Sequence, residues 1–234
     1  MPQMTIQEAP QTPAGLLLAI QQITNWGLAL LFPPRCGNCG RIDSGWCEDC
    51  TNRLHQHPIA PKEKLLSDNF TVLSSGVHDG ILRESLHNLK YLRQPQLGAI
   101  LGARLVPIFE AQSWQPDFIT PVPIHPKRLK ERGYNQADLI AQAFANRVNI
   151  PYLPYALTRT KETISQVGLS AQERQENMRD VFKAQSEDFG GKIGIIVDDV
   201  LTTGATLHEC ANALYNGGAK TVYGLTITRA SDVF

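Results

Sequence analysis

The sequence lacks an excess of charge of either sign, because 22 Lys and Arg residues balance 22 Asp and Glu residues in a chain of 234. A chain without a basic excess has no general electrostatic footprint for nucleic acid, so DNA binding would require a local basic patch. A Walker A pattern is also missing, which disfavours a self-contained ATP motor. Hydrophobic residues make up 42% and charged residues 19%, a balance typical of a globular protein.

Long apolar runs are scarce as well. The one candidate for a membrane span, residues 16–32, is short and is interrupted by four polar residues between positions 21 and 25. The segment before it contains no Lys or Arg, so it does not resemble a secretory signal. We therefore expect no membrane span, an amphipathic helix at residues 14–31 that packs on the body or on a partner, and a cytoplasmic location. Weak peripheral contact with a membrane is the alternative for that helix.

Cysteine is rare, and four of the five cysteines form two Cys-x-x-Cys pairs, Cys36 with Cys39 and Cys47 with Cys50. Two such pairs on short loops supply four thiolates for a tetrahedral ion, so the spacing predicts one structural zinc. A closed site of this kind has no open position for a substrate, and we assign it to stability. A disulfide pair is the competing interpretation, which a reducing compartment disfavours. Cys210 falls on a predicted helix and is expected in the core.

The composition divides the chain into three parts. Residues 1–13 are polar and predict a disordered tail. Residues 14–68 hold the predicted helix, the cysteine module and a polar, solvated linker at 51–68. Residues 69–234 form the main domain, since boundaries favour polar linkers with few contacts.

The main domain alternates strands with helices. Such alternation predicts an α/β fold with a mostly parallel sheet, helices on both faces, and ligands at the carboxyl ends of the strands. The predicted strands are residues 70–77, 117–124, 152–157, 194–197 and 221–228, and the predicted helices are 80–92, 98–110, 137–148 and 207–214.

Residues 194–206 carry the main functional signal. An apolar, β-branched run ends at Asp198 and Asp199, and a short loop of hydroxyl residues around Gly204 leads into a helix. Free N–H groups and the dipole at a helix N-terminus favour a phosphate, and carboxylates accept hydrogen bonds from sugar hydroxyls. The stretch therefore predicts a binding site for a phosphorylated ribose. The alternative is an ordinary strand end and helix cap, although a cap needs one hydroxyl and no acid pair.

Residues 197–206 resemble the phosphoribosyl-pyrophosphate (PRPP) motif of type I phosphoribosyltransferases, and the chain from about Cys36 to Arg229 resembles the ComF (competence protein F) family. The ComF likeness lies in the Lys90-Tyr91 pair, in the block from Arg128 to Gln136 and in residues 158–182. The Pro-Val-Pro at positions 121–123 resembles the pyrophosphate loop of the glutamine amidophosphoribosyltransferases.

The resemblance implies a type I phosphoribosyltransferase fold that binds PRPP with Mg²⁺. It assigns the ribose hydroxyls to Asp198 and Asp199. The 5′-phosphate falls to the loop of Thr202, Thr203, Gly204, Ala205 and Thr206. The pyrophosphate loop and a flexible hood that closes over PRPP supply Val122, Pro123, Arg128, Arg132, Lys161, Ser165 and Gln166. An ordinary solvated face or surface loop is the alternative for the basic cluster and for the hood.

Two functions follow from this resemblance. In one, the PRPP pocket is a binding element of a DNA-uptake protein, with single-stranded DNA and other competence proteins as partners. In the other, the chain is an active phosphoribosyltransferase of nucleotide metabolism or salvage, with no catalytic residue and no acceptor assigned. A glutamine-dependent amidotransferase is disfavoured, because its glutaminase half uses an N-terminal cysteine whereas this chain begins Met1-Pro2.

Overall fold

The computed structural model describes residues 33–42, 44–160, 181–185 and 189–231. The chain divides into two compact units, Met1–Cys47 and Glu48–Phe234. The predicted tail and helix before residue 33, and the predicted hood at residues 161–180, lie outside the described residues. Among the helices that are described, none is long and apolar enough to cross a membrane.

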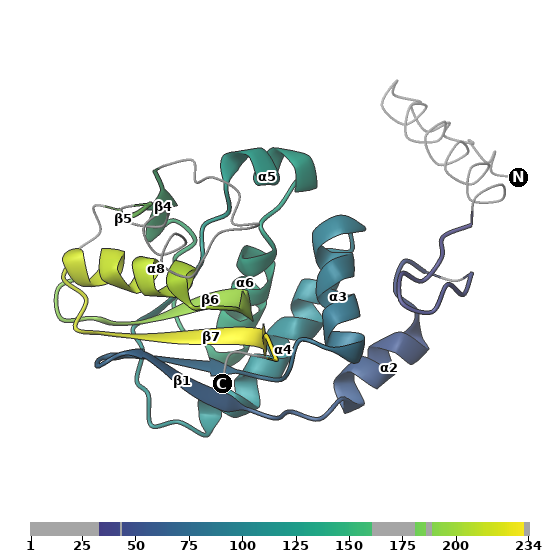
Figure 1. Cartoon of the computed structure of the whole chain (residues 1–234), viewed down its shortest axis with the longest axis horizontal. Helices are drawn as coiled ribbons and strands as arrows, with labels where there is room; N and C mark the ends of the chain where they lie inside the picture. The colour runs from purple at the N-terminus through teal and green to yellow at the C-terminus, as the bar shows by residue number, and fades with distance from the viewer. Residues whose placement is uncertain (1–32, 43, 161–180, 186–188, 232–234) are drawn as a thin grey trace, which may run out of the picture. The chain divides into compact units, whose positions relative to one another are not determined.

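The second unit is built on a five-stranded sheet with the strand order β1-β2-β7-β6-β3 (Figure 1). The strands are β1 (Lys62–Ser67), β2 (Phe70–Ser74), β3 (Phe118–Pro121), β6 (Ile193–Leu201) and β7 (Thr221–Arg229). Only β1 runs antiparallel to its neighbour, and the other three pairings in this sheet are parallel. The mostly parallel sheet predicted from the alternating pattern is thus confirmed.

Helices cover both faces of this sheet (Figure 1). On one face lie α3 (Gly80–Tyr91), α4 (Leu97–Glu110) and α6 (Gln136–Val148), and on the other lies α8 (Ala205–Asn216). Two short helices, α2 (Glu48–Gln56) and α5 (Pro126–Arg132), complete the described helices of this unit. The α/β class with helices on both faces is therefore also confirmed.

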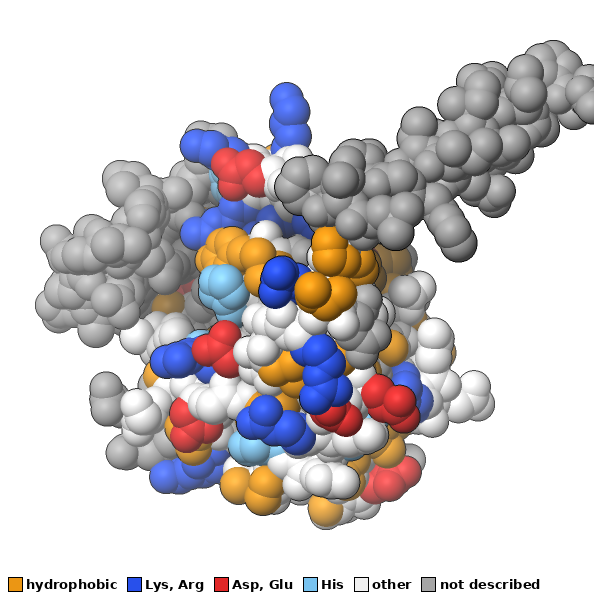
Figure 2. Space-filling model, turned by 90° about the vertical axis from the view of Figure 1, so that its right-hand side faces the viewer, with side chains coloured by type: hydrophobic (Ala, Val, Ile, Leu, Met, Phe, Trp, Pro, Cys, Tyr) orange, Lys and Arg blue, Asp and Glu red, His pale blue; other side chains and the backbone are white. Residues whose placement is uncertain are grey.

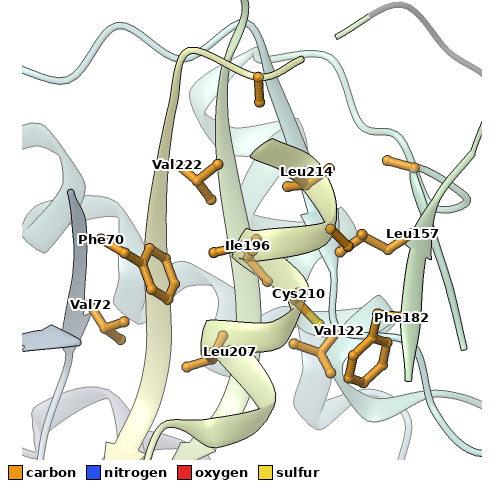
Figure 3. Packing of buried hydrophobic residues seen from close by; sticks show 14 of the residues in the cluster. Phe70, Val72, Val122, Leu157, Phe182, Ile196, Leu207, Cys210, Leu214 and Val222 are labelled. Carbon is orange, nitrogen blue, oxygen red and sulfur yellow. The ribbon is translucent and has the colours of Figure 1, made fainter. Parts of the chain in front are cut away.

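The apolar side of α8 fixes this helix on the sheet (Figure 3). Leu207, Cys210 and Leu214 point from successive turns toward Ile196 of β6 and Val222 of β7, and all five are buried. A fully buried leucine contributes about 1.5–3 kcal/mol, so this contact anchors the helix firmly. Cys210 lies in the core, as its position on the predicted helix indicated. The packing places the N-terminus of α8 beside the end of β6.

Two local predictions were wrong. The strand predicted at residues 152–157 is reduced to one parallel bridge between Tyr152 and Ile119 of β3. The regular strand comes later, as β4 (Leu157–Arg159), which pairs antiparallel with β5 (Phe182–Ala184) in a separate two-stranded sheet. Residues 51–68, predicted as a solvated linker, contain most of α2 and all of β1. Buried Arg104 of α4 stabilises the α2 end, because its guanidinium donates to the carbonyls of Leu54, His57 and Pro58 at 2.9–3.1 Å.

Candidate functional site

The turn from β6 to α8 depends on Gly204. This residue has a φ of +91°, in the left-handed region that glycine adopts at low cost. A Cβ at this position would lie 2.5 Å from a methyl group of Leu66 in β1, so a side chain would collide as well as strain the backbone. Glycine at 204 therefore lets the loop turn tightly into α8. Its closeness to a bound phosphate stays a prediction.

The N-terminus of α8 is left open by the protein itself. Its N-cap residue, Gly204, offers no side-chain hydrogen bond, and the N–H of Ala205 makes a long contact of 3.4 Å to the hydroxyl of Thr203. Thr202 and Thr203 are exposed, and Thr206 is half-buried. N–H groups of a first helical turn have no intrahelical partner and carry the positive end of the helix dipole. This loop can therefore accept an anion without displacing a side-chain cap.

The two adjacent acids lie within β6, which continues through Val200 and Leu201. Successive side chains of a strand point to opposite faces. Ile196 packs in the core under α8, so Asp198, two residues later, faces the α8 side and Asp199 faces the opposite side. The acids therefore lie on opposite sides of β6 and within the strand, not directly after its end, where the sequence pattern had placed them.

Their partners differ accordingly. Asp198 is half-buried, and its Oδ1 accepts a hydrogen bond of 2.8 Å from the backbone N–H of Asp199. Asp199 is only 5% exposed, and its Oδ2 forms an ion pair with Nζ of Lys90, the penultimate residue of α3. The Lys90 side chain keeps 21% of its surface exposed. Asp199 is thus a buried carboxylate with an internal counter-ion, whereas Asp198 has none of its own among the residues that the structure describes.

The electrostatics follow this asymmetry. Burial, and then the negative charge of Asp199, raise the pKa of Asp198 well above its ordinary value. Burial also acts to raise the pKa of Asp199, but the ammonium of Lys90 outweighs it and lowers that pKa. Of the two acids, Asp198 is therefore the one that takes up a proton first as the pH falls.

The predicted pyrophosphate loop is held by the start of α6. Asn135 caps this helix through the N–H of Ala137, and its amide also donates to the carbonyl of Val122 at 2.9 Å. Val122 is buried and Pro123 half-buried. The block from Arg128 to Gln136 thus has a structural part, which positions the loop after β3.

A cavity of about 250 Å³ opens between α5 and the end of α3. Lysine and arginine dominate its lining, which consists of Lys90, Tyr91, Arg93, Arg128, Glu131 and Arg132. The Arg132 guanidinium lies 5.1 Å from the ring centre of Tyr91 and donates to Gln136 at 2.8 Å. Figure 2 shows Lys and Arg side chains gathered at the level of α5, above exposed hydrophobic ones. An anion fits this lining.

The structure brings some predicted site residues together and leaves others apart. Arg128 and Arg132 line one cavity, and Lys90 joins that cavity to Asp199. Lys161, Ser165 and Gln166 lie outside the described residues. Sequence reasoning noted Lys90 and Tyr91 as a family-like pair but gave them no role, and it missed Arg93. The only signal for them was their place at the end of a predicted helix.

The four paired cysteines cluster in space. Their sulfur atoms, from Cys36, Cys39, Cys47 and Cys50, all lie within 4.8 Å of one another, and none is in a disulfide. The backbone N–H of Cys47 also points at the sulfur of Cys36, 3.4 Å away. Four thiols at this spacing can hold a metal ion.

The donor sets decide which metals fit. Four thiolates suit zinc and are soft ligands that magnesium does not favour. Asp198 and Asp199 are the carboxylates that Mg²⁺ would prefer, but Asp199 is occupied by Lys90 and Asp198 already accepts a backbone N–H. The acid pair as arranged therefore does not build a magnesium site, and Mg²⁺ stays a prediction tied to PRPP itself.

Comparison with known proteins adds an independent result. Residues 129–229 match the model of the phosphoribosyl transferase domain family. Competence protein F of Haemophilus influenzae is 31% identical over 204 residues, which cover 84% of this chain and 85% of that protein. DNA utilization protein YhgH of Escherichia coli O6:H1 is 34% identical over 205 residues, covering 85% of this chain and 88% of that one. Competence protein ComFC of Bacillus subtilis is 26% identical over 83% of this chain and 78% of that protein.

Proposed function

The chain belongs to the competence protein F (ComF) family and contains a phosphoribosyl transferase domain, and from this premise we propose that it binds PRPP in a process of DNA uptake or utilisation. The observation that carries the proposal is the continuous site from Asp198 to Thr206. There a carboxylate, an uncapped helix N-terminus and a left-handed glycine follow one another at the carboxyl end of a parallel strand. Ligands of open α/β sheets bind at such ends.

Each part of PRPP has a matching group in this arrangement. The loop of Thr202 to Thr206 offers hydroxyls and first-turn N–H groups to the 5′-phosphate. Asp198 faces the same side as α8 and would accept from the ribose hydroxyls. The cationic cavity beside α5 would take the pyrophosphate, with Arg128 and Arg132 as donors. Magnesium would arrive bound to the pyrophosphate oxygens and would neutralise their charge.

A DNA surface is proposed at α5 and the adjacent end of α3. No α5 residue is buried, and Leu129 and Tyr91 are 44% and 61% exposed beside Arg128 and Arg132. Cations next to exposed aromatic and apolar groups suit single-stranded DNA, whose phosphates and bases they contact at once. Because Arg128 and Arg132 also line the cavity, the binding of PRPP and the binding of DNA would influence each other there.

Zinc is proposed for the four-cysteine cluster. The donor set favours this metal, and a closed four-thiolate site contributes folding free energy rather than catalysis. Other competence proteins are proposed as further partners, on the names of the relatives alone.

An active phosphoribosyltransferase is the second candidate, favoured by the family match over residues 129–229. Transfer would proceed by loss of pyrophosphate from the anomeric carbon through an oxocarbenium-like state. In such a reaction the protein mainly positions the groups and stabilises charge. Release of pyrophosphate in the presence of candidate bases and amines separates this activity from binding alone.

The direct test is calorimetric titration of PRPP with Mg²⁺ into the zinc-loaded protein. We expect saturable binding by the wild type and a loss of about tenfold to a hundredfold in Asp198→Asn, since a charged acceptor contributes about 1.5–3 kcal/mol. Glu110→Gln removes an exposed carboxylate at the far end of α4 and should bind as the wild type does. Failure of the wild type to bind PRPP would refute the proposal.

A further inference from the structure

The ion pair between Lys90 and Asp199 connects two parts of the candidate site. Asp199 belongs to β6 and Lys90 to α3, and the Lys90 side chain also lines the cationic cavity. The carboxylate of Asp199 is 7% exposed and the lysine side chain 21% exposed. The Lys90 ammonium contacts Asp199, while part of the lysine side chain remains open to the cavity.

The charges around Lys90 balance in a specific way. Lys90 forms its ion pair with Asp199 and lowers the pKa of that acid, so Asp199 is the member of the acid pair whose charge Lys90 neutralises. Among the described residues, no carboxylate forms an ion pair with Arg93, Arg128 or Arg132. Glu131 offsets one of these three cations, so the cavity retains a net positive charge for a ligand anion.

We propose that Lys90 is the built-in counter-ion of the acid pair and occupies the place that a divalent cation would take there, so that this chain binds the ribose of PRPP without metal at Asp198 or Asp199. This inference rests on the proposed function for its ligand. Its physical basis is independent of it: a carboxylate already paired with an ammonium in a buried setting is a poor ligand for a second cation.

Lys90 is accordingly a positioning residue. It keeps Asp199 ionised and held toward α3, which leaves Asp198 as the acid on the side of the phosphate loop. His78 lies in the same cluster, where its Nδ1 is 2.9 Å from the hydroxyl of Thr228. Burial, and then the charge of Lys90, lower the pKa of His78, so this imidazole is a neutral neighbour that does not compete for the acids.

The first experiment needs no ribose ligand. Mn²⁺ alone is titrated into zinc-loaded wild type, Lys90→Met and the double variant Lys90→Met with Asp199→Asn, and bound metal is counted by electron paramagnetic resonance. We expect one additional Mn²⁺ site in Lys90→Met that is absent from the other two proteins. Equal Mn²⁺ binding by wild type and a folded Lys90→Met, whether one site or none, overturns the inference.

The second experiment measures PRPP affinity with Mg²⁺ and in buffer freed of Mg²⁺ over a chelating resin, with zinc left in the protein. Because Mg²⁺ also binds the pyrophosphate of PRPP, the change in wild-type affinity is the reference. Without Mg²⁺, Lys90→Met should lose about tenfold or more in affinity beyond the wild-type change, and it should regain most of that loss when Mg²⁺ returns. Arg93→Met, the matched control, removes a cation of the same cavity that has no contact with the acids. It should weaken PRPP binding by the same factor in both buffers.

The wild-type measurements decide the matter even where Lys90→Met is too unstable to use. A wild type that binds Mn²⁺ at a site lost in Asp198→Asn contradicts the counter-ion role. A wild type that binds no PRPP in either buffer refutes the proposed function, and the Mn²⁺ titration then still tests the counter-ion role.

Discussion

Replacing the two adjacent acids one at a time should have opposite effects on stability. Asp199→Asn leaves the ammonium of Lys90 without its buried partner, whereas Asp198→Asn removes a carboxylate whose charge is already disfavoured. The asparagine at 198 keeps an oxygen that can accept the N–H of residue 199, as Asp198 does now. We therefore expect a substantial loss of stability for Asp199→Asn and little or none for Asp198→Asn.

The magnitude follows from burial. Removing one partner of a fully buried ion pair costs about 3–5 kcal/mol. Lys90 keeps 21% of its side chain exposed and can regain water through the cavity, so the loss for Asp199→Asn is reduced to about 1.5–3 kcal/mol. For a unit of this size each kcal/mol corresponds to about 2–4 °C, which gives a fall in Tm of about 3–12 °C.

The dependence of stability on pH tests a second time which of the two variants is less stable. The raised pKa of Asp198 means that its stabilising contribution is complete below its unfolded value and is lost as pH rises through the folded value. The lowered pKa of Asp199 means that its contribution is present above its unfolded value and is lost as pH falls through the folded value. The Tm gap between the two variants should therefore be widest near neutral pH and should narrow in acid.

Thermal melts of wild type and both variants between pH 4 and 8 measure these quantities. A double variant that also replaces Lys90 with Met should recover most of the stability lost in Asp199→Asn, because no unpaired buried charge remains. Equal losses in the two single variants, or a larger loss in Asp198→Asn, would refute the assignment of Lys90 to Asp199.

The remaining predictions concern the metal, the DNA surface and the turn. Protein purified without a tag should contain about one zinc per chain, and Cys36→Ser with Cys39→Ser should lose it; a metal-free, soluble wild type with these cysteines in disulfides would contradict this. Arg128→Ala or Arg132→Ala should weaken single-stranded DNA binding for all sequences alike. Each change should also flatten the slope of log affinity against log salt by about the amount that one phosphate contact contributes. Unchanged affinity would mean that the DNA surface lies elsewhere. Gly204→Ala should lower Tm by several degrees, since the left-handed backbone costs about 1 kcal/mol or more and the collision adds to it; an unchanged Tm would show that the loop relaxes freely.

Most of the second unit could be predicted from local patterns. Helices α3, α4, α6 and α8 each begin and end within about two residues of their predicted bounds, because each has a periodic apolar face that packs on the sheet. The sheet class followed from the alternation of strands and helices. Patterns of this kind act within one element, so the sequence displays them directly.

The errors arose where tertiary contacts decide. Residues 62–67 alternate weakly and carry two lysines, yet they form β1 because the edge of β2 offers a partner within a tight turn. The helix α2 ends where Arg104, far along the chain, caps its last carbonyls. The pairing of Lys90 with Asp199 likewise joins residues more than a hundred positions apart. No local signal announces such a partner.

The roles of the two acids, however, were within reach of the sequence. Consecutive side chains of a strand point to opposite sides of the sheet, so two adjacent carboxylates do not lie on the same side. Asp198 shares its side with Ile196 and therefore with α8 and the phosphate loop, while Asp199 meets the helix layer of α3 on the other side. A carboxylate that enters a helix-covered face needs a cation there, and the end of α3 supplies Lys90. The division between an acid open to a ligand and an acid tied to the fold is thus a consequence of strand geometry.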